Sequence, residues 1–180
     1  NVNIPAAQSN QWRVETFDVP KSDWGAFIYG HRTPKPGTYT RLMRGSIVVM
    51  SDTDAEKRDH SFAVHKANGH CLINGLGLGM VLGACLLKNS VTKVTVVEIS
   101  ADVINLVAHH YADARVEIIQ SDALLYKPPK GVRYGMVWHD IWDNICADNL
   151  PQMHALHRKY GKRCDWQGSW ARQECERVRG

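Results

Sequence analysis

An alternation of short apolar runs with helical segments, between residues 70 and 142, constrains the fold most strongly. The glycine turn "GLGLG" follows the first run and leads into a segment predicted to be helical, which ends near Asn89. Strands that alternate with helices of about 10–15 residues form βαβ units with right-handed crossovers and a parallel sheet. We therefore predict an α/β, Rossmann-like fold with four buried strands, within "HCLING" (70–75), "TKVTVVEIS" (92–100), "RVEIIQSDAL" (115–124) and "YGMVWHDIW" (134–142).

The two ends of the chain are expected to differ from this core. We assign residues 1–60 to a small N-terminal β appendage and linker, with strand candidates at 24–30 and 45–51, and residues 61–180 to the main domain. The polar run from Ser51 to Asp54 offers helix caps, so a short helix is predicted over about 54–67. After Trp142 only helices are expected, which would leave the sheet shortened at its C-terminus.

The net charge of the chain is concentrated at one end. From Leu150 onward, seven basic residues face three acidic ones, and this difference of +4 equals the net charge of all 180 residues. A basic segment is compatible with nucleic-acid contact, but a solvated helical tail is the simpler interpretation. A homodimer is a further hypothesis about partners.

Composition indicates a reduced, cytoplasmic protein. The five cysteines are odd in number and show no C-x-x-C spacing. No apolar run is long enough for a membrane span, and no basic segment followed by an apolar run appears near the N-terminus.

The glycine turn has the composition of a ligand-binding loop. The dinucleotide fingerprint G-x-G-x-x-G fails, because Met80 or Leu82 stands where the last glycine is required. Acidic residues stand at the ends of the next three strands: Glu98, Asp122 and Asp140. Because ligands of doubly wound sheets bind at the carboxyl ends of the strands, these side chains are candidates for one site.

The motif Gly75-Leu-Gly77-Leu-Gly79, followed 19 residues later by Glu98, resembles motif I and its downstream acid in class I S-adenosylmethionine-dependent methyltransferases. The resemblance implies that S-adenosylmethionine is the cofactor and that the glycines cradle it. It further implies that the Glu98 carboxylate accepts hydrogen bonds from the ribose hydroxyls and that Asp122 contacts the adenine amino group. The residues that follow these two acids, Ile99 and Ala123, are expected to contact the cofactor as well.

A second resemblance covers a little over half of the chain. Residues 45–79 and the segment "DIWDN" (140–144) resemble spermidine synthases, in which an aspartate pair ends the fourth strand. The resemblance implies that Asp140 takes the proton of the substrate amine and that Asp143 helps to bind this amine. The acid that these enzymes carry in the glycine loop is replaced by Leu78, which cannot pair with an ammonium group. We therefore predict methyl transfer from S-adenosylmethionine to an unknown acceptor.

Several alternatives stay open at this point. The chain is either this methyltransferase, a polyamine aminopropyltransferase, or a non-catalytic module that binds S-adenosylmethionine or a partner. His139 is either a base or a structural residue, and no metal site is expected. Trp138 and Trp142 either stack on substrate or belong to the core or a cofactor lid. Trp166 and Trp170, spaced as on one helix, either cover the sheet edge, which we expect, or face a partner or a nucleic acid.

Overall fold

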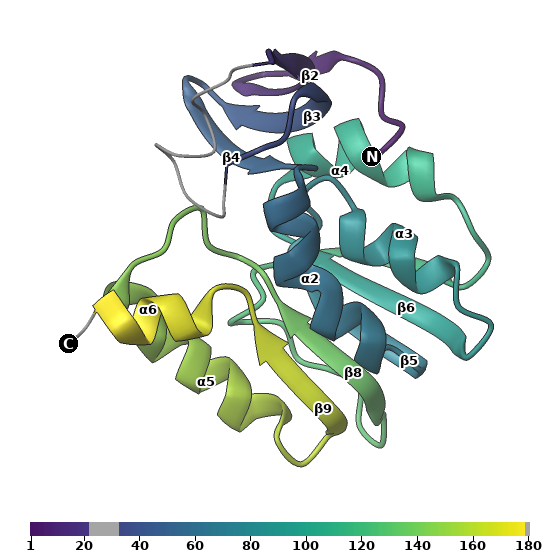
Figure 1. Cartoon of the computed structure of the whole chain (residues 1–180). Coiled ribbons are helices and arrows are strands. Elements are labelled where there is room, and N and C mark those ends of the chain that lie inside the picture. Colours follow the sequence, from purple (N-terminus) through teal and green to yellow (C-terminus); the bar gives the residue numbers. More distant parts are fainter. Residues whose placement is uncertain (22–32, 179–180) are drawn as a thin grey trace.

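The computed structural model describes residues 1–21 and 33–178, which form two β-sheets with helices on both faces of the larger one. Figure 1 shows the small N-terminal sheet at the top, above the larger sheet and its helices. The strand predicted at 24–30 lies outside the described residues. Within the described residues, no helix combines the length and the apolar character needed to cross a membrane.

The larger sheet is parallel throughout and has the order β7-β6-β5-β8-β9. The strand β5 lies at its centre, with β6 on one side and β8 on the other, so the strand order reverses beside β5. The predicted α/β class is confirmed, and each of the four predicted segments contains a strand. The bounds are β5 Gly69–Asn74, β6 Val91–Glu98, β7 Val116–Gln120, β8 Tyr134–His139 and β9 Cys164–Ser169.

Helices cover both faces of this sheet. One face packs against α2 (Asp54–Lys66), α3 (Met80–Leu86) and α4 (Ala101–Val107), which continues into the 3₁₀ turn η2 (Ala108–Tyr111). The other face packs against α5 (Leu150–Tyr160), which follows the short turn η3 (Ala147–Asn149), and α6 (Arg172–Val178). The helix expected over about 54–67 is confirmed as α2, and the expected domain boundary after residue 60 lies within it.

Local sequence explains where two of these helices form. The Ser100 hydroxyl accepts a hydrogen bond from the Val103 amide, which caps α4. In α5, Pro151 stands in the first turn, where its missing N–H costs nothing. The buried residues of α5 recur along one face, as expected for an amphipathic helix: Leu150, Met153, Leu156 and Tyr160.

The prediction of a sheet that stops at four strands is wrong. The segment Cys164–Ser169 forms a fifth strand, β9, which pairs in parallel with β8 from Tyr134↔Cys164 to His139↔Ser169. This segment has a glycine and no β-branched residue, so its own strand propensity is low. Pairing with the buried strand β8 overrides that propensity, and only α6 remains helical beyond it.

The connection from β7 to β8 carries no helix, and the sheet face beside it is correspondingly polar. The His70 ring nitrogen Nε2 lies 2.9 Å from the Thr95 hydroxyl, which donates to Glu117 at 3.3 Å. Glu117 also pairs with Lys93 at 2.7 Å. These strands bury apolar side chains on the opposite face, so the pattern matches a sheet covered on one side at this position.

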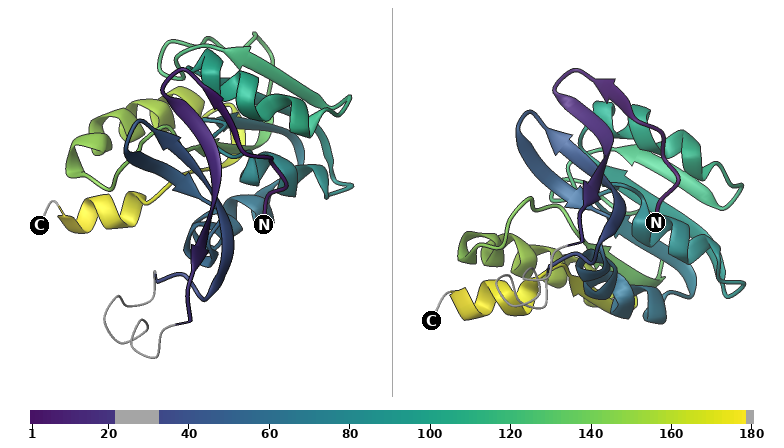
Figure 2. Two further views of the ribbon diagram at one scale, coloured as in Figure 1. Left: turned by 90° about the horizontal axis from the view of Figure 1, so that it is seen from above. Right: turned by 45° about the horizontal axis from the view of Figure 1, so that its top comes forward.

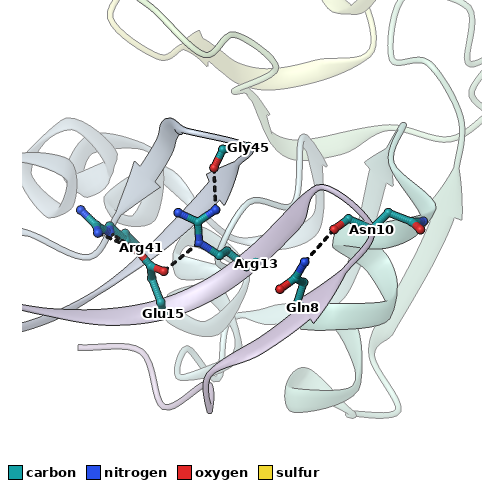
Figure 3. Close-up of polar contacts among 6 residues, drawn as sticks. All are labelled: Gln8, Asn10, Arg13, Glu15, Arg41 and Gly45. Atoms are coloured by element: carbon teal, nitrogen blue, oxygen red, sulfur yellow. Dashed lines mark hydrogen bonds and ion pairs between the residues drawn. The ribbon is translucent and has the colours of Figure 1, made fainter.

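The N-terminal sheet is antiparallel, with the order β1-β2-β3-β4. The strand predicted at 45–51 is confirmed as β4, whereas the other three strands were not predicted individually. On its surface, Glu15 receives hydrogen bonds from Arg13 and Arg41, which lower the pKa of Glu15 (Figure 3). The bounds are β1 Ala7–Ser9, β2 Trp12–Val19, β3 Gly37–Arg44 and β4 Ile47–Ser51.

Polar contacts attach the small sheet to the main body. The Ser9 hydroxyl and the Asn10 amide both donate to Asp102 of α4, at 2.6 and 2.8 Å. Asp52, which is fully buried, accepts hydrogen bonds from the Val2 and Thr40 amides at 2.8 and 2.7 Å. Figure 2 shows the resulting position of the small sheet beside α4 and above α2.

The packing of α5 against its face of the sheet can be tested by substitution. Leu156→Ala, at a fully buried position, is expected to lower the free energy of unfolding by about 2–5 kcal/mol through lost burial and a residual cavity. Leu125→Ala, at a side chain that is 73% exposed, is expected to change it by less than about 0.5 kcal/mol. Urea unfolding of both variants measures the difference, and equal losses would contradict the packing of α5.

Candidate functional site

A cavity of about 260 Å³ lies where the carboxyl ends of the parallel strands meet the N-terminal sheet. Its upper wall comes from Trp12, Leu42 and Met50 of the small sheet. All site residues predicted from the sequence line it, with the exception of Gly79: Gly75, Gly77, Glu98, Ile99, Asp122, Ala123, Asp140 and Asp143. Residues distant in sequence therefore meet at the point where the strand order reverses, as doubly wound sheets require.

The three glycines of the turn have different neighbours. A Cβ added at Gly75 would lie 1.9 Å from the Asp140 carbonyl oxygen, so only glycine lets β5 and β8 approach this closely. Gly77 faces the thioether sulfur of Met50, which also lies 3.1 Å from the Leu78 amide. Gly79 lies outside the cavity lining and faces the ring of Tyr111, so its small size serves packing against η2.

Glu98 is the most constrained acid of the cavity. Its side chain belongs to a residue only 8% exposed, and its two carboxylate oxygens accept hydrogen bonds from the Leu76 and Ser100 amides, both at 2.8 Å. Burial raises the pKa of Glu98, while these backbone donors oppose the rise. Each oxygen keeps a lone pair for a further donor, so the fixed carboxylate is suited to a vicinal diol.

Asp122 lies just after β7, at the start of a turn. It also lines the cavity. Its Oδ1 atom accepts the Leu124 amide at 2.7 Å, and among the described residues its Oδ2 atom has no hydrogen-bond partner. Lys159 of α5 donates to the Ala123 and Leu124 carbonyls at 2.9 and 3.2 Å. One cation of the basic C-terminal region thus holds the loop that carries Asp122.

Asp140 follows β8 and is positioned by backbone and side chain. Its amide donates to the Asn74 carbonyl at 2.8 Å, and its Oδ2 atom lies 3.0 Å from Nε2 of His60. The side chain of Asp140 is 14% exposed, and that of His60 only 3%. Asp140 therefore lines the cavity, while one of its carboxylate oxygens contacts His60 of α2.

Asp143, the second acid of the predicted pair, is not free. Its carboxylate forms an ion pair with Arg44 of β3, and the Arg44 guanidinium lies over the Trp12 ring at 5.5 Å from the centroid. This ion pair connects the N-terminal sheet to the loop after β8. It also neutralises the charge that the resemblance to spermidine synthases assigns to amine binding.

His139 is a structural residue and not a base. It is fully buried, and its ring nitrogens lie 2.8 Å from the Asn74 amide nitrogen and 3.3 Å from the Gln167 carbonyl oxygen. Burial lowers the pKa of His139 to about 3, so the ring is neutral at pH 7. The ring links the last residue of β5 to β9 on the face opposite His60.

The tryptophans are distributed differently from expectation. Trp142 lines the cavity and donates from its indole nitrogen to Gln152 at 2.8 Å. Trp138 packs in the core, stacked on Trp166 with ring centroids 6.3 Å apart. The helix predicted to carry Trp166 and Trp170 is wrong, because Trp166 belongs to β9 and Trp170 follows it into the cavity wall.

Sequence reasoning missed several residues of the site, namely Trp12, Arg44, Met50, His60 and Trp170. Alternation of apolar and polar residues in "WRVETFDV" was the available pattern for β2. For His60, a helical residue among charged neighbours, no local pattern distinguishes this position from a surface histidine.

Comparison with solved structures places this architecture among known folds. A Streptococcus mutans protein described as a SAM-dependent methyltransferase aligns with 85% of this chain and 48% of its own, at 13% identity and a TM-score of 0.54. The N-methyltransferase NodS from Bradyrhizobium japonicum WM9 aligns with 68% of this chain and 72% of its own, at 14% identity and a TM-score of 0.50. The chain has the Rossmann-like methyltransferase fold.

Spermidine synthase from Thermotoga maritima is also similar, with 19% identity over 87% of this chain and a TM-score of 0.48. The chain spans about half the length of this enzyme, 52%, and of the Streptococcus mutans protein. No protein-family model and no curated protein sequence matches the chain. At these identities the similarity concerns the fold, and the function is argued below from the cavity.

The contact between the ends of β5 and β8 predicts an unequal effect of two glycine substitutions. Gly75→Ala is expected to lower the free energy of unfolding by about 3 kcal/mol or more, because its Cβ meets backbone. Gly131→Ala, also at positive φ but with no atom within 4 Å, is expected to cost about 1 kcal/mol. Chemical denaturation compares the two, and similar losses would contradict the close approach.

The buried neutral ring of His139 predicts acid lability. Between pH 6.5 and about 3 the unfolded chain protonates this histidine and the folded protein does not, so stability falls as the pH falls. His139 alone is expected to contribute a slope of about 1.4 kcal/mol per pH unit in this range.

His139→Gln is expected to be less stable than wild type at pH 7.5 but to show a flatter pH dependence between 6.5 and 4.5. His109→Gln, at an exposed residue of η2, should retain the wild-type slope. Urea midpoints at several pH values measure both, and an unchanged slope in His139→Gln would exclude this role.

Proposed function

We propose that the protein is an S-adenosylmethionine-dependent methyltransferase whose acceptor binds beside Asp140. The observation that carries the proposal is the fixed carboxylate of Glu98, held by two backbone amides at the floor of a cavity that Asp122 and Asp140 also line. A buried acid at a strand end, oriented toward a cavity and beside a glycine turn, has the geometry for binding a ribose diol.

The rest of the cavity is compatible with the same ligand. The unpartnered Oδ2 atom of Asp122 is suited to accept from an exocyclic amino group, and Ala123 lies next to it in the wall. Acidic side chains dominate the polar part of the lining, and this charge favours a cationic ligand. When bound, S-adenosylmethionine would supply an electrophilic methyl group on a sulfonium centre.

Asp140 is the residue assigned to the acceptor. An attacking amine or hydroxyl must lose a proton, and a carboxylate within hydrogen-bond reach takes it. Asp140 is partly buried and lines the cavity. Its Oδ2 atom contacts His60, and its Oδ1 atom has no hydrogen-bond partner among the described residues. Trp12, Trp142 and Trp170 line the same space and would exclude water from the acceptor.

Two observations favour methyl transfer over aminopropyl transfer. Leu78 is fully buried and absent from the cavity lining, so the glycine loop offers no acid for the amine of a decarboxylated cofactor. The ion pair of Asp143 with Arg44 also leaves less negative charge for a polyamine. The hypothesis of a non-catalytic module was motivated by missing C-terminal strands and by a poorly specified acceptor site, and the presence of β9 weakens the first of these motives.

Calorimetric titration tests the proposal. We expect micromolar binding of S-adenosylmethionine and S-adenosylhomocysteine, and weaker binding of the decarboxylated cofactor and NAD. Glu98→Ala is expected to weaken the binding of S-adenosylmethionine and S-adenosylhomocysteine by about 1–3 kcal/mol, the cost of a lost charge-assisted hydrogen-bond partner. Glu117→Ala, which removes a surface acid of the neighbouring strand, serves as the matched control and should leave binding unchanged.

Each outcome has a distinct meaning. Preference for the decarboxylated cofactor, with its consumption in the presence of polyamines, would support aminopropyl transfer. The non-catalytic module would be supported if the cofactor binds but is not turned over with amine, hydroxyl, protein or nucleic-acid acceptors, and if Asp140→Ala causes no loss of biological effect. Contact of the basic C-terminal region with nucleic acid, and a homodimer, remain hypotheses.

A further inference from the structure

The helix α2 places one buried histidine directly behind the proposed acceptor site. His60 is 2% exposed, and its Nε2 atom lies 3.0 Å from Oδ2 of Asp140. Its ring packs against the ring of Trp138 in a T-shaped arrangement, with centroids 6.0 Å apart. The other ring nitrogen, Nδ1, is buried and has no hydrogen-bond partner among the described residues.

Asp140 divides its two oxygens between this histidine and the cavity. Oδ2 contacts His60, whereas Oδ1 has no hydrogen-bond partner in the described part of the chain. Asp140 lines the cavity together with Gly75 and Gly77, so its carboxylate lies beside the glycine turn. The charge that this space experiences is therefore that of the pair and not of Asp140 alone.

The surroundings of His60 favour its protonated form. Burial lowers the pKa of His60, but the hydrogen bond and charge of Asp140, with the charges of Glu56 and Asp59, outweigh burial and raise it. On its other side His60 lines a second cavity of about 350 Å³, together with Asn1, Asp52 and Lys57. By contrast, burial lowers the pKa of His139 and His157 to about 3 and 4, so both rings are neutral at pH 7.

We propose that His60 and Asp140 form a pair whose net charge depends on the protonation of His60, and that this charge determines how tightly the sulfonium of the cofactor is bound. The pair carries one negative charge when His60 is neutral and none when His60 is protonated. A sulfonium cation beside the free oxygen is therefore bound more tightly at higher pH, whereas the neutral thioether of the product is not. This inference rests on the proposed function, and it makes His60 a specificity-determining residue that acts through Asp140.

The ratio of two dissociation constants isolates this effect. S-adenosylmethionine and S-adenosylhomocysteine share all polar groups and differ in the charged methyl sulfonium. In wild-type protein, the preference for S-adenosylmethionine over S-adenosylhomocysteine is expected to fall threefold to tenfold as the pH falls through the titration of His60, the order expected for charges several ångströms apart in a partly screened site.

Two variants on the same helix provide the comparison. His60→Gln keeps a neutral donor toward Asp140 and is expected to reduce this pH dependence to that of the free ligands. His65→Gln, at an exposed position of α2, should retain the wild-type pH dependence. Circular dichroism confirms that each variant is folded. Equal pH dependence of the ratio in wild type and in folded His60→Gln would overturn the proposal.

A second measurement needs no variant. By linkage, the sulfonium must oppose protonation of His60 as strongly as protonation opposes the sulfonium. NMR titration of the His60 ring in wild-type protein is therefore expected to show a midpoint about 0.5–1 pH unit lower with S-adenosylmethionine than with S-adenosylhomocysteine, the same threefold to tenfold effect. Identical titration midpoints of His60 with the two ligands would overturn the proposed role of the His60–Asp140 pair. Failure of both ligands to bind would refute the proposed function itself.

Discussion

The close approach of the ends of β5 and β8 is the contact on which the rest of the site depends. Gly75 lies against the Asp140 carbonyl, and the Asp140 amide donates to Asn74, so two parallel strands are fixed to each other where they stop. From this point the chain leaves in opposite directions, toward α3 and toward α5. The cavity lies at this carboxyl edge, where the connections after β5 and β8 diverge.

The four acids predicted around this cavity are each held by a different kind of partner. Backbone amides fix Glu98, a turn fixes Asp122, a histidine fixes Asp140 and an arginine of the small sheet fixes Asp143. Buried carboxylates are costly without such partners. The pairing leaves Glu98, Asp122 and Asp140 with acceptor capacity toward the cavity and removes most of it from Asp143.

The N-terminal sheet forms part of the wall of the site. Trp12, Leu42 and Met50 close the upper wall, and Arg44 ties this wall to the loop after β8. The helix α2, which follows the sheet directly, then brings His60 behind Asp140. A segment that precedes the glycine turn in sequence thus sets both the shape and the charge of the space beside it.

The sequence by itself determined the α/β class, four of the five parallel strands and the acids at the ends of three of them. These features are local: apolar runs, a glycine turn and acidic residues near strand ends are visible in short windows. Only the tertiary structure decided the fifth strand, the pairing of Asp143 with Arg44 and the position of His60 behind Asp140. β9 becomes a strand through its pairing with β8, and the two side-chain pairs join residues 99 and 80 positions apart. Contacts across such distances depend on how layers pack, which no local propensity records.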